Sequence, residues 1–377
     1  MQAAVSRADL KRFVDLATST PTLLLDLGIV EKDYRTLEAA LPGAGIFYAL
    51  KANPHPEIAR LLQTLGCGFE VSSLGELKLL LDLAVEGERI ISSNPVKSPE
   101  FIRKAYAAGV RHFAFDSAAE LDKIAELAPE AELAVRLSVP NDSSEWPLDK
   151  KFGVDIEAAV HLLADARDRG LRPHGLIFHV GSQCRDVAGW ITALEKAKLL
   201  WDEAARAGVE LHLLNVGGGI PVAYSRNDVP FPAAIGDAII ETRARLFPSE
   251  VETYLEPGRG VVGRAGTMVC SVIGVADRED GRWVYLDAGI FHGLAEAMGG
   301  ISYRFLSLAE GAEEPCTVAG PSCDSVDVVA RDVMLPRVRV GDRIVIPACG
   351  AYTTAYSSEF NGFSGPDTKI VPSVRNV

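Results

Sequence analysis

The sequence predicts an α/β protein: a TIM-like (β/α)8 barrel followed by a second, mostly antiparallel β domain. Two observations predict this fold. From about residue 46, short apolar segments alternate with segments of helical period, and the eighth apolar segment ends near residue 256. After about residue 262 the helical period mostly stops, and short strands separated by turn residues follow.

The barrel strands are expected near 46–50, 68–71, 89–92, 112–115, 132–137, 175–179, 211–216 and 253–256. The helices between them are expected near 55–65, 73–83, 98–108, 117–127, 156–169, 187–207 and 231–246. Several helices begin at a capping serine, such as Ser73, Ser98 and Ser117. An open doubly wound sheet is the alternative, but no G-x-G-x-x-G sequence opens a first helix.

The β domain is expected to contain strands at Thr267–Ala276, Arg282–Asp287, Cys316–Ala319, Ser325–Val333 and Asp342–Ile346. The segment Pro21–Asp26 precedes the barrel and could add a strand to it. The expected division is a barrel of residues 27–262 and a β-sandwich or β-barrel domain of residues 1–26 plus 263–377.

Composition excludes several classes of protein. The formal net charge of −13 argues against nucleic acid and anionic membranes as partners. No apolar run is long enough to span a bilayer, and the first residues lack the pattern of a signal peptide, so a cytoplasmic protein is expected. The six cysteines include no C-x-x-C pair, and no His/Asp/Glu cluster recurs at the strand ends, so no metal is expected.

Lys51 ends the apolar run Ile46–Leu50, where a buried amine could form a Schiff base with an aldehyde. His179 follows the strand near 175–179, three glycines follow the strand near 211–216, and Glu256 and Arg259 follow the last strand. Each feature also has a structural reading: a lysine leaving a strand, a packed histidine, a tight turn, or an ion pair of Glu256 with Arg259. Together they match pyridoxal phosphate, which needs a lysine, amides and an arginine for its phosphate, and an acid for its ring nitrogen.

The chain resembles the barrel-type (fold III) pyridoxal-phosphate decarboxylases, which include the ornithine, lysine, arginine and diaminopimelate decarboxylases. The resemblance covers about residues 20 to 365. It is carried by the segments Tyr48–Asn53, His179–Ser182, Gly217–Gly219, Glu256–Arg259, Gly320–Asp327, Gly350–Thr353 and Phe360–Phe363.

The resemblance implies pyridoxal 5'-phosphate as the cofactor and a role for each matching residue. Lys51 would bind the aldehyde, Glu256 would pair with the pyridine nitrogen, and His179 would lie against the ring. The phosphate would be held by Ser182, Gly218, Gly219, Gly258, Arg259 and Tyr352.

Cys323 would return a proton to the carbanion, and in this family it comes from the neighbouring subunit, which implies a homodimer. A buried structural thiol is the alternative for Cys323. Glu70 and Arg136, each closing a strand, would lie behind the residues that touch the cofactor, or would form a structural salt bridge with each other.

The resemblance implies removal of the α-carboxylate as CO2 from an L-amino acid with a polar distal end, such as ornithine, lysine or a derivative in specialised metabolism. Asp324 and Phe360 would contact this substrate. The family's second aspartate aligns with Gly299–Gly300, and Glu296 is its nearest substitute.

Other functions remain open. Arg304 could bind a distal carboxylate, as in diaminopimelate, carboxynorspermidine, or a siderophore or carrier-linked intermediate. A racemase and a catalytically inactive binding protein on the same fold are the further alternatives.

Overall fold

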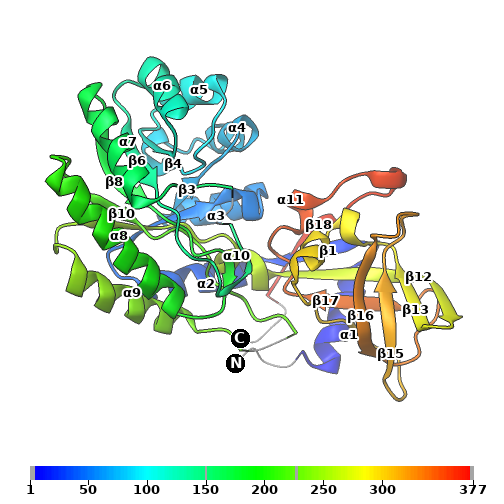
Figure 1. The fold of residues 1–377 in the computed structure, drawn as a ribbon. Helices are drawn as coiled ribbons and strands as arrows, with labels where there is room; N and C mark the ends of the chain where they lie inside the picture. The colour runs from blue at the N-terminus through cyan, green and yellow to red at the C-terminus, as the bar shows by residue number, and fades with distance from the viewer. Residues whose placement is uncertain (1–4, 149–150, 226–227, 374–377) are drawn as a thin grey trace. The chain divides into compact units, whose positions relative to one another are not determined.

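The computed structural model describes residues 5–148, 151–225 and 228–373. The chain forms two compact units, drawn in Figure 1: a barrel unit of Tyr34–Pro221 and Pro230–Gly258, and a β unit of Met1–Asp33, Val222–Val229 and Arg259–Val377. The expected division gave 27–33, 222–229 and 259–262 to the barrel, whereas their contacts place them in the β unit.

Within the described residues, eight parallel strands close into a barrel, which confirms the predicted fold class. In spatial order the strands are β10 (Leu213–Asn215), β11 (Glu252–Leu255), β2 (Gly45–Ala49), β3 (Gly68–Glu70), β4 (Ile90–Ser92), β5 (His112–Phe115), β6 (Glu132–Arg136) and β8 (Arg172–Ile177). Several are buried on both faces, which explains why they read in the sequence as short unbroken apolar runs.

Helices follow these strands along the chain and lie outside them in Figure 1. They are α3 (Pro56–Thr64), α4 (Leu74–Asp82), α5 (Pro99–Ala107), α6 (Ala118–Leu127), α7 (Ile156–Asp168), α8 (Ala188–Arg206) and α9 (Pro232–Leu246), and α2 (Leu27–Ala40) precedes β2. The predicted caps are confirmed, because Ser73, Ser98 and Ser117 each accept a backbone N–H of the first turn. A short ribbon of β7 (Ser144–Trp146) and β9 (Ser182–Cys184) was not predicted.

The β unit is built on a mostly antiparallel sheet of β14 (Leu306–Ser307), β17 (Arg343–Pro347), β12 (Gly266–Arg278), β13 (Gly281–Leu286), β15 (Glu314–Ala319) and β16 (Val328–Leu335). It also contains β1 (Thr22–Asp26), β18 (Asp367–Val371) and the helices α1 (Arg7–Leu16), α10 (Arg259–Val262) and α11 (Thr353–Tyr356).

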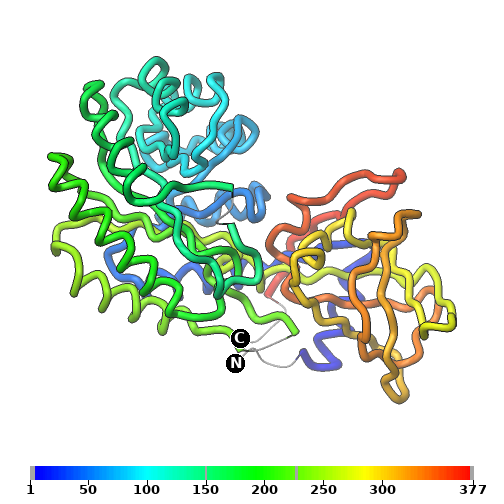
Figure 2. The backbone as a smooth tube through the Cα atoms, in the orientation of Figure 1, coloured from blue at the N-terminus to red at the C-terminus, as the bar shows by residue number. Residues whose placement is uncertain are grey.

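The first strand does not join the barrel; it pairs within the β unit, the domain to which the expected division assigns residues 1–26. β1 pairs antiparallel with β12 and parallel with β18. In Figure 2 the blue start of the chain therefore lies beside its red end. The cause is non-local: all five side chains of β1 are buried, and their strand partners lie more than 240 residues away in the sequence.

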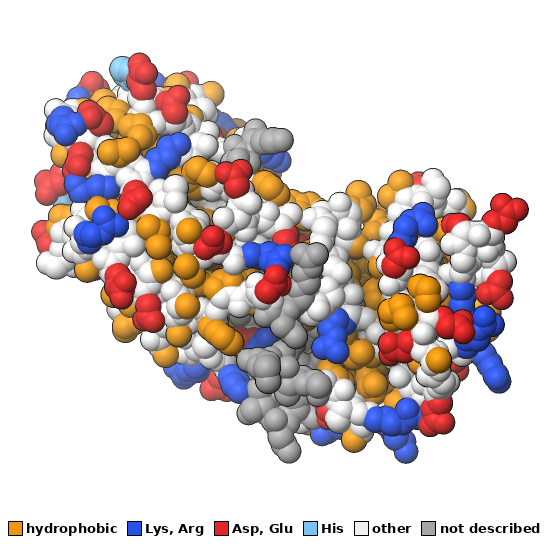
Figure 3. All heavy atoms as spheres, turned by 60° about the horizontal axis from the view of Figure 1, so that its bottom comes forward, with side chains coloured by type: hydrophobic (Ala, Val, Ile, Leu, Met, Phe, Trp, Pro, Cys, Tyr) orange, Lys and Arg blue, Asp and Glu red, His pale blue; other side chains and the backbone are white. Residues whose placement is uncertain are grey.

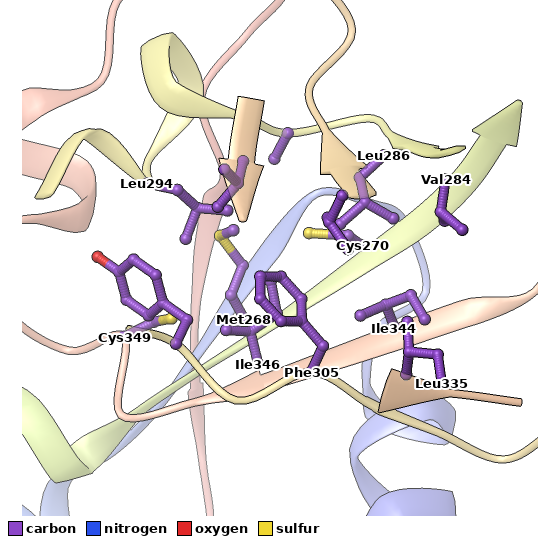
Figure 4. Packing of buried hydrophobic residues seen from close by; sticks show 14 of the residues in the cluster. Met268, Cys270, Val284, Leu286, Leu294, Phe305, Leu335, Ile344, Ile346 and Cys349 are labelled. Atoms are coloured by element: carbon purple, nitrogen blue, oxygen red, sulfur yellow. The ribbon is translucent and has the colours of Figure 1, made fainter. Parts of the chain in front are cut away.

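The β unit has its own hydrophobic core, shown in Figure 4. Met268 and Cys270 of β12 pack there with Val284 and Leu286 of β13 and with Ile344 of β17. These residues alternate along their strands, so one face of the sheet is apolar.

The surface is mixed in charge. On the face shown in Figure 3, acidic and basic side chains are interspersed, although the net charge is −13. Among the described residues no helix combines the length and apolar character needed to cross a bilayer.

Candidate active site

The carboxyl ends of the barrel strands carry a ring of polar side chains. Glu70, Arg136 and Asn215 are the last residues of β3, β6 and β10. Lys51, Ser93, His179 and Glu256 follow the ends of β2, β4, β8 and β11 within two residues. Because parallel strands end at one mouth of a barrel, side chains far apart in the sequence meet there.

Lys51 lies on a 3-10 turn, Leu50–Ala52, that directly follows β2. Its Nζ donates to Oε2 of Glu70 at 2.6 Å. The Lys51 side chain is 47% exposed, whereas that of Glu70 is 1% exposed. The amine therefore lies where a small molecule at the mouth of the barrel can reach it, and a buried carboxylate holds it there.

Glu256 is buried, and its Oε1 accepts from the Ser93 hydroxyl and from Asn215 Nδ2, the latter at 2.6 Å. Burial raises the pKa of this carboxyl to about 7, and the negative charge of Glu70 acts in the same direction. A carboxylate under these conditions is stabilised by a cationic partner, such as a protonated ring nitrogen.

His179 accepts a hydrogen bond at Nδ1 from the backbone N–H of Gly181 at 2.9 Å, so a neutral ring carries its proton on Nε2. Burial lowers the pKa of this histidine well below its ordinary value, and the charges of Arg136 and Lys51 add to the effect. Glu70 pairs with Lys51, and no ion pair joins it to Arg136 among the described residues.

The glycine triplet lies against this cluster. Gly217 and Gly219 have φ angles of +67° and +97°, which favour glycine. A Cβ on Gly218 would lie 2.6 Å from the carbonyl oxygen of Glu256 and 3.1 Å from Nε2 of His179. The backbone can therefore approach His179 and Glu256 only because residue 218 has no side chain.

Two further residues, Ser182 and Gly258, were predicted to bind the cofactor phosphate. Ser182 is the first residue of β9, where it pairs with Trp146, and it is half-buried. Gly258 is buried in the turn after β11, two residues beyond Glu256.

In the β unit, Arg259 opens α10 and is buried. Both of its terminal nitrogens bind the Glu296 carboxylate, with Nη1 to Oε2 at 2.8 Å. Nη1 also donates to the hydroxyl of Tyr224, and the guanidinium lies 5.1 Å from the ring centroid of Tyr352. Arg259 is thus fixed in place by three side chains of its own unit.

Glu296 was expected to contact the substrate. The structure gives it a different partner, because it is 4% exposed and both of its oxygens bind Arg259. Its partner within the described residues is thus the Arg259 guanidinium.

Cys323 lies at the tip of an exposed loop, whereas the other five cysteines are buried. Its Sγ donates to Oδ1 of Asn361 at 3.2 Å. The base of the loop is held by Asp327, whose carboxylate accepts from the N–H groups of Ile290 at 2.7 Å and Ser322 at 3.0 Å. A rigid base therefore presents an accessible thiol, and the buried structural thiol considered from the sequence does not describe Cys323.

The predicted substrate residues are also accessible. Asp324 is exposed beside Cys323, and its Oδ1 accepts from the N–H of Val326 at 2.9 Å. Phe360 is 39% exposed and packs on Phe291, with 4.7 Å between ring centroids. Arg304 is half-buried before β14.

Sequence reasoning missed Ser93, Asn215, Asp327 and Tyr224 as partners of the predicted residues. A signal existed for Ser93 and Asn215, since both lie where a strand ends, the criterion that selected Glu256. Tyr224 had no such signal, because its contact with Arg259 depends on the segment 222–229 packing within the β unit.

The barrel and its ring of lysine, histidine and carboxylates define an enzyme of the class that binds a small cofactor at the carboxyl ends of the strands. Comparison with known proteins is consistent with this class. Residues 27–263 match the family model described as the pyridoxal-binding domain of the pyridoxal-dependent decarboxylases.

The chain is 41% identical to the lysine/ornithine decarboxylase of Selenomonas ruminantium, over 91% of this chain and 88% of that protein. The solved lysine decarboxylase from Selenomonas ruminantium superposes with a TM-score of 0.90 at 38% identity, covering 98% of this chain and 97% of the other. The Vibrio vulnificus lysine/ornithine decarboxylase complexed with cadaverine gives a TM-score of 0.89 at 33% identity, with coverages of 97% and 98%.

The chain therefore belongs to the pyridoxal-dependent decarboxylases of fold III, and it is a pyridoxal-phosphate-dependent amino-acid decarboxylase. The barrel unit fits the cofactor. An accessible amine, a buried carboxylate whose pKa is raised by burial and a glycine triplet converge at one mouth of the barrel.

Proposed function

We propose that the chain removes the α-carboxylate from L-lysine, L-ornithine or a close derivative with a cationic distal end. The observation that carries this proposal is the loop in which an exposed carboxylate, Asp324, directly follows an exposed thiol, Cys323. A distal ammonium needs an accessible anion, and the new amine needs a proton at Cα. Relatives complexed with cadaverine and with putrescine support the same substrate class.

Bound pyridoxal phosphate would supply an electron sink for the electron pair released when the carboxylate leaves. Lys51 would hold the cofactor through its amine, and Glu70 would orient that amine by the hydrogen bond it accepts from Nζ. Glu256 would hold the proton on the ring nitrogen, and the Ser93 and Asn215 hydrogen bonds would orient its carboxylate. His179, kept neutral by burial, would lie against the ring.

For the phosphate, the barrel unit would provide the amides of the glycine segments, Gly218, Gly219 and Gly258, and the hydroxyl of Ser182. The resemblance also assigns Arg259 and Tyr352 to the phosphate. The fixed position of Arg259 between Glu296 and Tyr224 supports this role, since a preset guanidinium loses little freedom when it binds an anion.

A substrate with a distal carboxylate, such as diaminopimelate, is the second candidate. Arg304 is the residue that favours it, and the absence of an acid at Gly299–Gly300 removes one of the two carboxylates expected for a distal ammonium. Carboxynorspermidine and siderophore or carrier-linked intermediates belong to the same alternative.

The experiment is a substrate panel on the purified, cofactor-loaded protein. L-Lysine, L-ornithine, L-arginine, diaminopimelate and acyl-linked diamino acids are compared by CO2 release and by chirality of the recovered substrate. CO2 from lysine or ornithine is the expected result. Preference for diaminopimelate would favour the second candidate, and change of chirality without CO2 would mean a racemase.

Lys51→Ala is the test of the covalent lysine, and Lys104→Ala, on the exposed face of α5, is its matched control. We expect CO2 release to fall roughly 10³-fold or more in the first and to be unchanged in the second, because Lys51 acts directly on the cofactor. Equal activity of the two variants would remove Lys51 from the mechanism.

We further propose a homodimer in which Cys323 serves the active site of the partner subunit. Lys51→Ala and Cys323→Ala protein, each impaired alone, are mixed and allowed to exchange subunits. Roughly a quarter of the wild-type activity should return, because half of the dimers are mixed and each mixed dimer has one intact site. No recovery despite demonstrated exchange would place both residues in the same subunit's site.

A further inference from the structure

The amino-terminal ends of three neighbouring barrel strands hold a second polar cluster. His112 and Glu132 are the first residues of β5 and β6, and they are direct partners in the parallel ladder. His174 is the third residue of β8, two positions after Arg172, which is the ladder partner of Glu132. Because side chains alternate along a strand, these groups face the same side of the sheet.

Their potential ligand atoms are already close together. His112 Nε2 lies 3.3 Å from Glu132 Oε2, and one ligand atom from each of His112, Glu132 and His174 lies within 4.8 Å of the other two. The rings of His112 and His174 are 5.8 Å apart, centroid to centroid.

We propose that His112, Glu132 and His174 form a binding site for one divalent transition-metal ion, with Zn²⁺ as the best match. Two imidazoles and one carboxylate, with water as the fourth ligand, are a common donor set for zinc. Magnesium and calcium prefer oxygen ligands, so this donor set selects against them. Atoms bonded to zinc at about 2.0–2.1 Å lie roughly 3.3 Å apart, so the His112–Glu132 pair needs little adjustment.

A neighbouring residue orients the carboxylate. Arg172 Nη2 binds Glu132 Oε1 at 2.9 Å, which leaves Oε2 directed at His112. Metal-binding carboxylates are usually held in this way by a second hydrogen bond.

The site is accessible from solvent. The side chains of His112 and Glu132 are 23% and 21% exposed, so an ion can enter without opening the barrel. The ion would join the starts of β5, β6 and β8, and the catalytic lysine and glutamate follow strand ends at the other mouth. We expect it to stabilise the barrel without taking part in decarboxylation.

The first experiment measures zinc binding to the tag-free, cofactor-loaded protein by calorimetry after metals have been removed. One ion per chain is expected. His112→Asn and His174→Asn should each weaken binding at least about tenfold. His161→Asn is the matched control, since His161 lies on the exposed surface of α7, and it should bind zinc like the wild type.

Zinc affinity of the His112→Asn/His174→Asn double variant equal to that of the wild type would overturn the proposal. The bound zinc would then be an adventitious ion only, and the three side chains would form a metal-free cluster. The second experiment needs no variant: anomalous diffraction at the zinc edge from zinc-soaked crystals. A peak between the three side chains supports the site, and its absence at saturating zinc overturns it.

The sequence predicted no metal because it has no C-x-x-C pair and no His/Asp/Glu cluster recurs at the expected strand ends. Glu132 and His174 are 42 positions apart, and the pairing of β6 with β5 and with β8 brings the two near His112. No spacing motif in the sequence signals such a site.

Discussion

Strand β11 carries a glutamate at each end, Glu252 where it begins and Glu256 directly after it ends. Glu252 is exposed, and its carboxylate accepts from the Tyr254 hydroxyl at 3.1 Å. Glu256 is 6% exposed, and burial raises its pKa to about 7. The two residues differ in their access to water, and that difference separates a solvated surface acid from a buried acid that needs a cation.

The same contrast holds around the barrel. At the carboxyl ends, Glu70 and Arg136 are 1% and 9% exposed. At the amino ends, the Arg172 side chain is 61% exposed and that of Glu132 is 21% exposed. Glu70 and Arg136 are therefore only weakly screened and act strongly on a bound molecule, whereas water screens the more exposed Arg172.

The largest expected effect is that of Glu256→Gln on catalysis. The amide keeps the shape of the side chain but cannot hold a proton on the ring nitrogen. We expect kcat to fall about 10²–10³-fold, the range seen when one electrostatic partner of developing charge is lost. Glu252→Gln, at the other end of the same strand, should change kcat less than about twofold. If steady-state CO2 assays show the same loss of kcat in both variants, burial does not distinguish the two glutamates.

A smaller effect is expected in the pH dependence of stability of the cofactor-free protein. The pKa of Glu256 is raised from 4.5 to about 7 in the folded state, so its contribution to stability is fully present below pH 4.5 and is lost as the pH rises to about 7. The loss is about 3 kcal/mol in the free energy of unfolding.

Denaturant unfolding at pH 5 and pH 8 measures this contribution. Between pH 5 and pH 8 the wild type should lose more free energy of unfolding than the Glu256→Gln variant does. The Glu252→Gln variant should behave like the wild type. Bound cofactor should reduce the loss, because a protonated ring nitrogen would add a cation beside the Glu256 carboxylate. A Glu256→Gln profile parallel to that of the wild type would mean that the carboxyl titrates normally.

Much of the barrel could be predicted because its signals are local. The strand 112–115 was predicted with the bounds it has, and the helix expected near 98–108 begins after its capping serine, Ser98. The strands β7 and β18 were missed because their residues are largely polar and not fully buried, so they lack an apolar pattern. The pairing of β1 depends on partners at the other end of the chain, which no local pattern encodes.

The candidate site divides in the same way. Lys51, His179 and Glu256 could be selected because each follows a strand end, and the resemblance added Cys323 and Asp324. The Arg259–Glu296 ion pair joins residues 37 positions apart and depends on how the segment 290–300 packs. Side-chain partners of this kind depend on packing, so the sequence suggested a substrate contact for Glu296 where the structure has a buried ion pair.

The smallest expected effect lies at the amino mouth, in Arg172→Gln. The Arg172 side chain is 61% exposed and water screens its charge, so loss of the ion pair with Glu132 should change the free energy of unfolding by at most about 1 kcal/mol and leave decarboxylation unchanged. Zinc affinity should nevertheless fall roughly tenfold, because Glu132 loses the contact that directs its free oxygen toward His112. Unaltered zinc binding in calorimetry would mean that Arg172 does not orient the carboxylate. A fall in kcat comparable to that of Glu256→Gln would mean that the two mouths are coupled and that water access alone does not separate them.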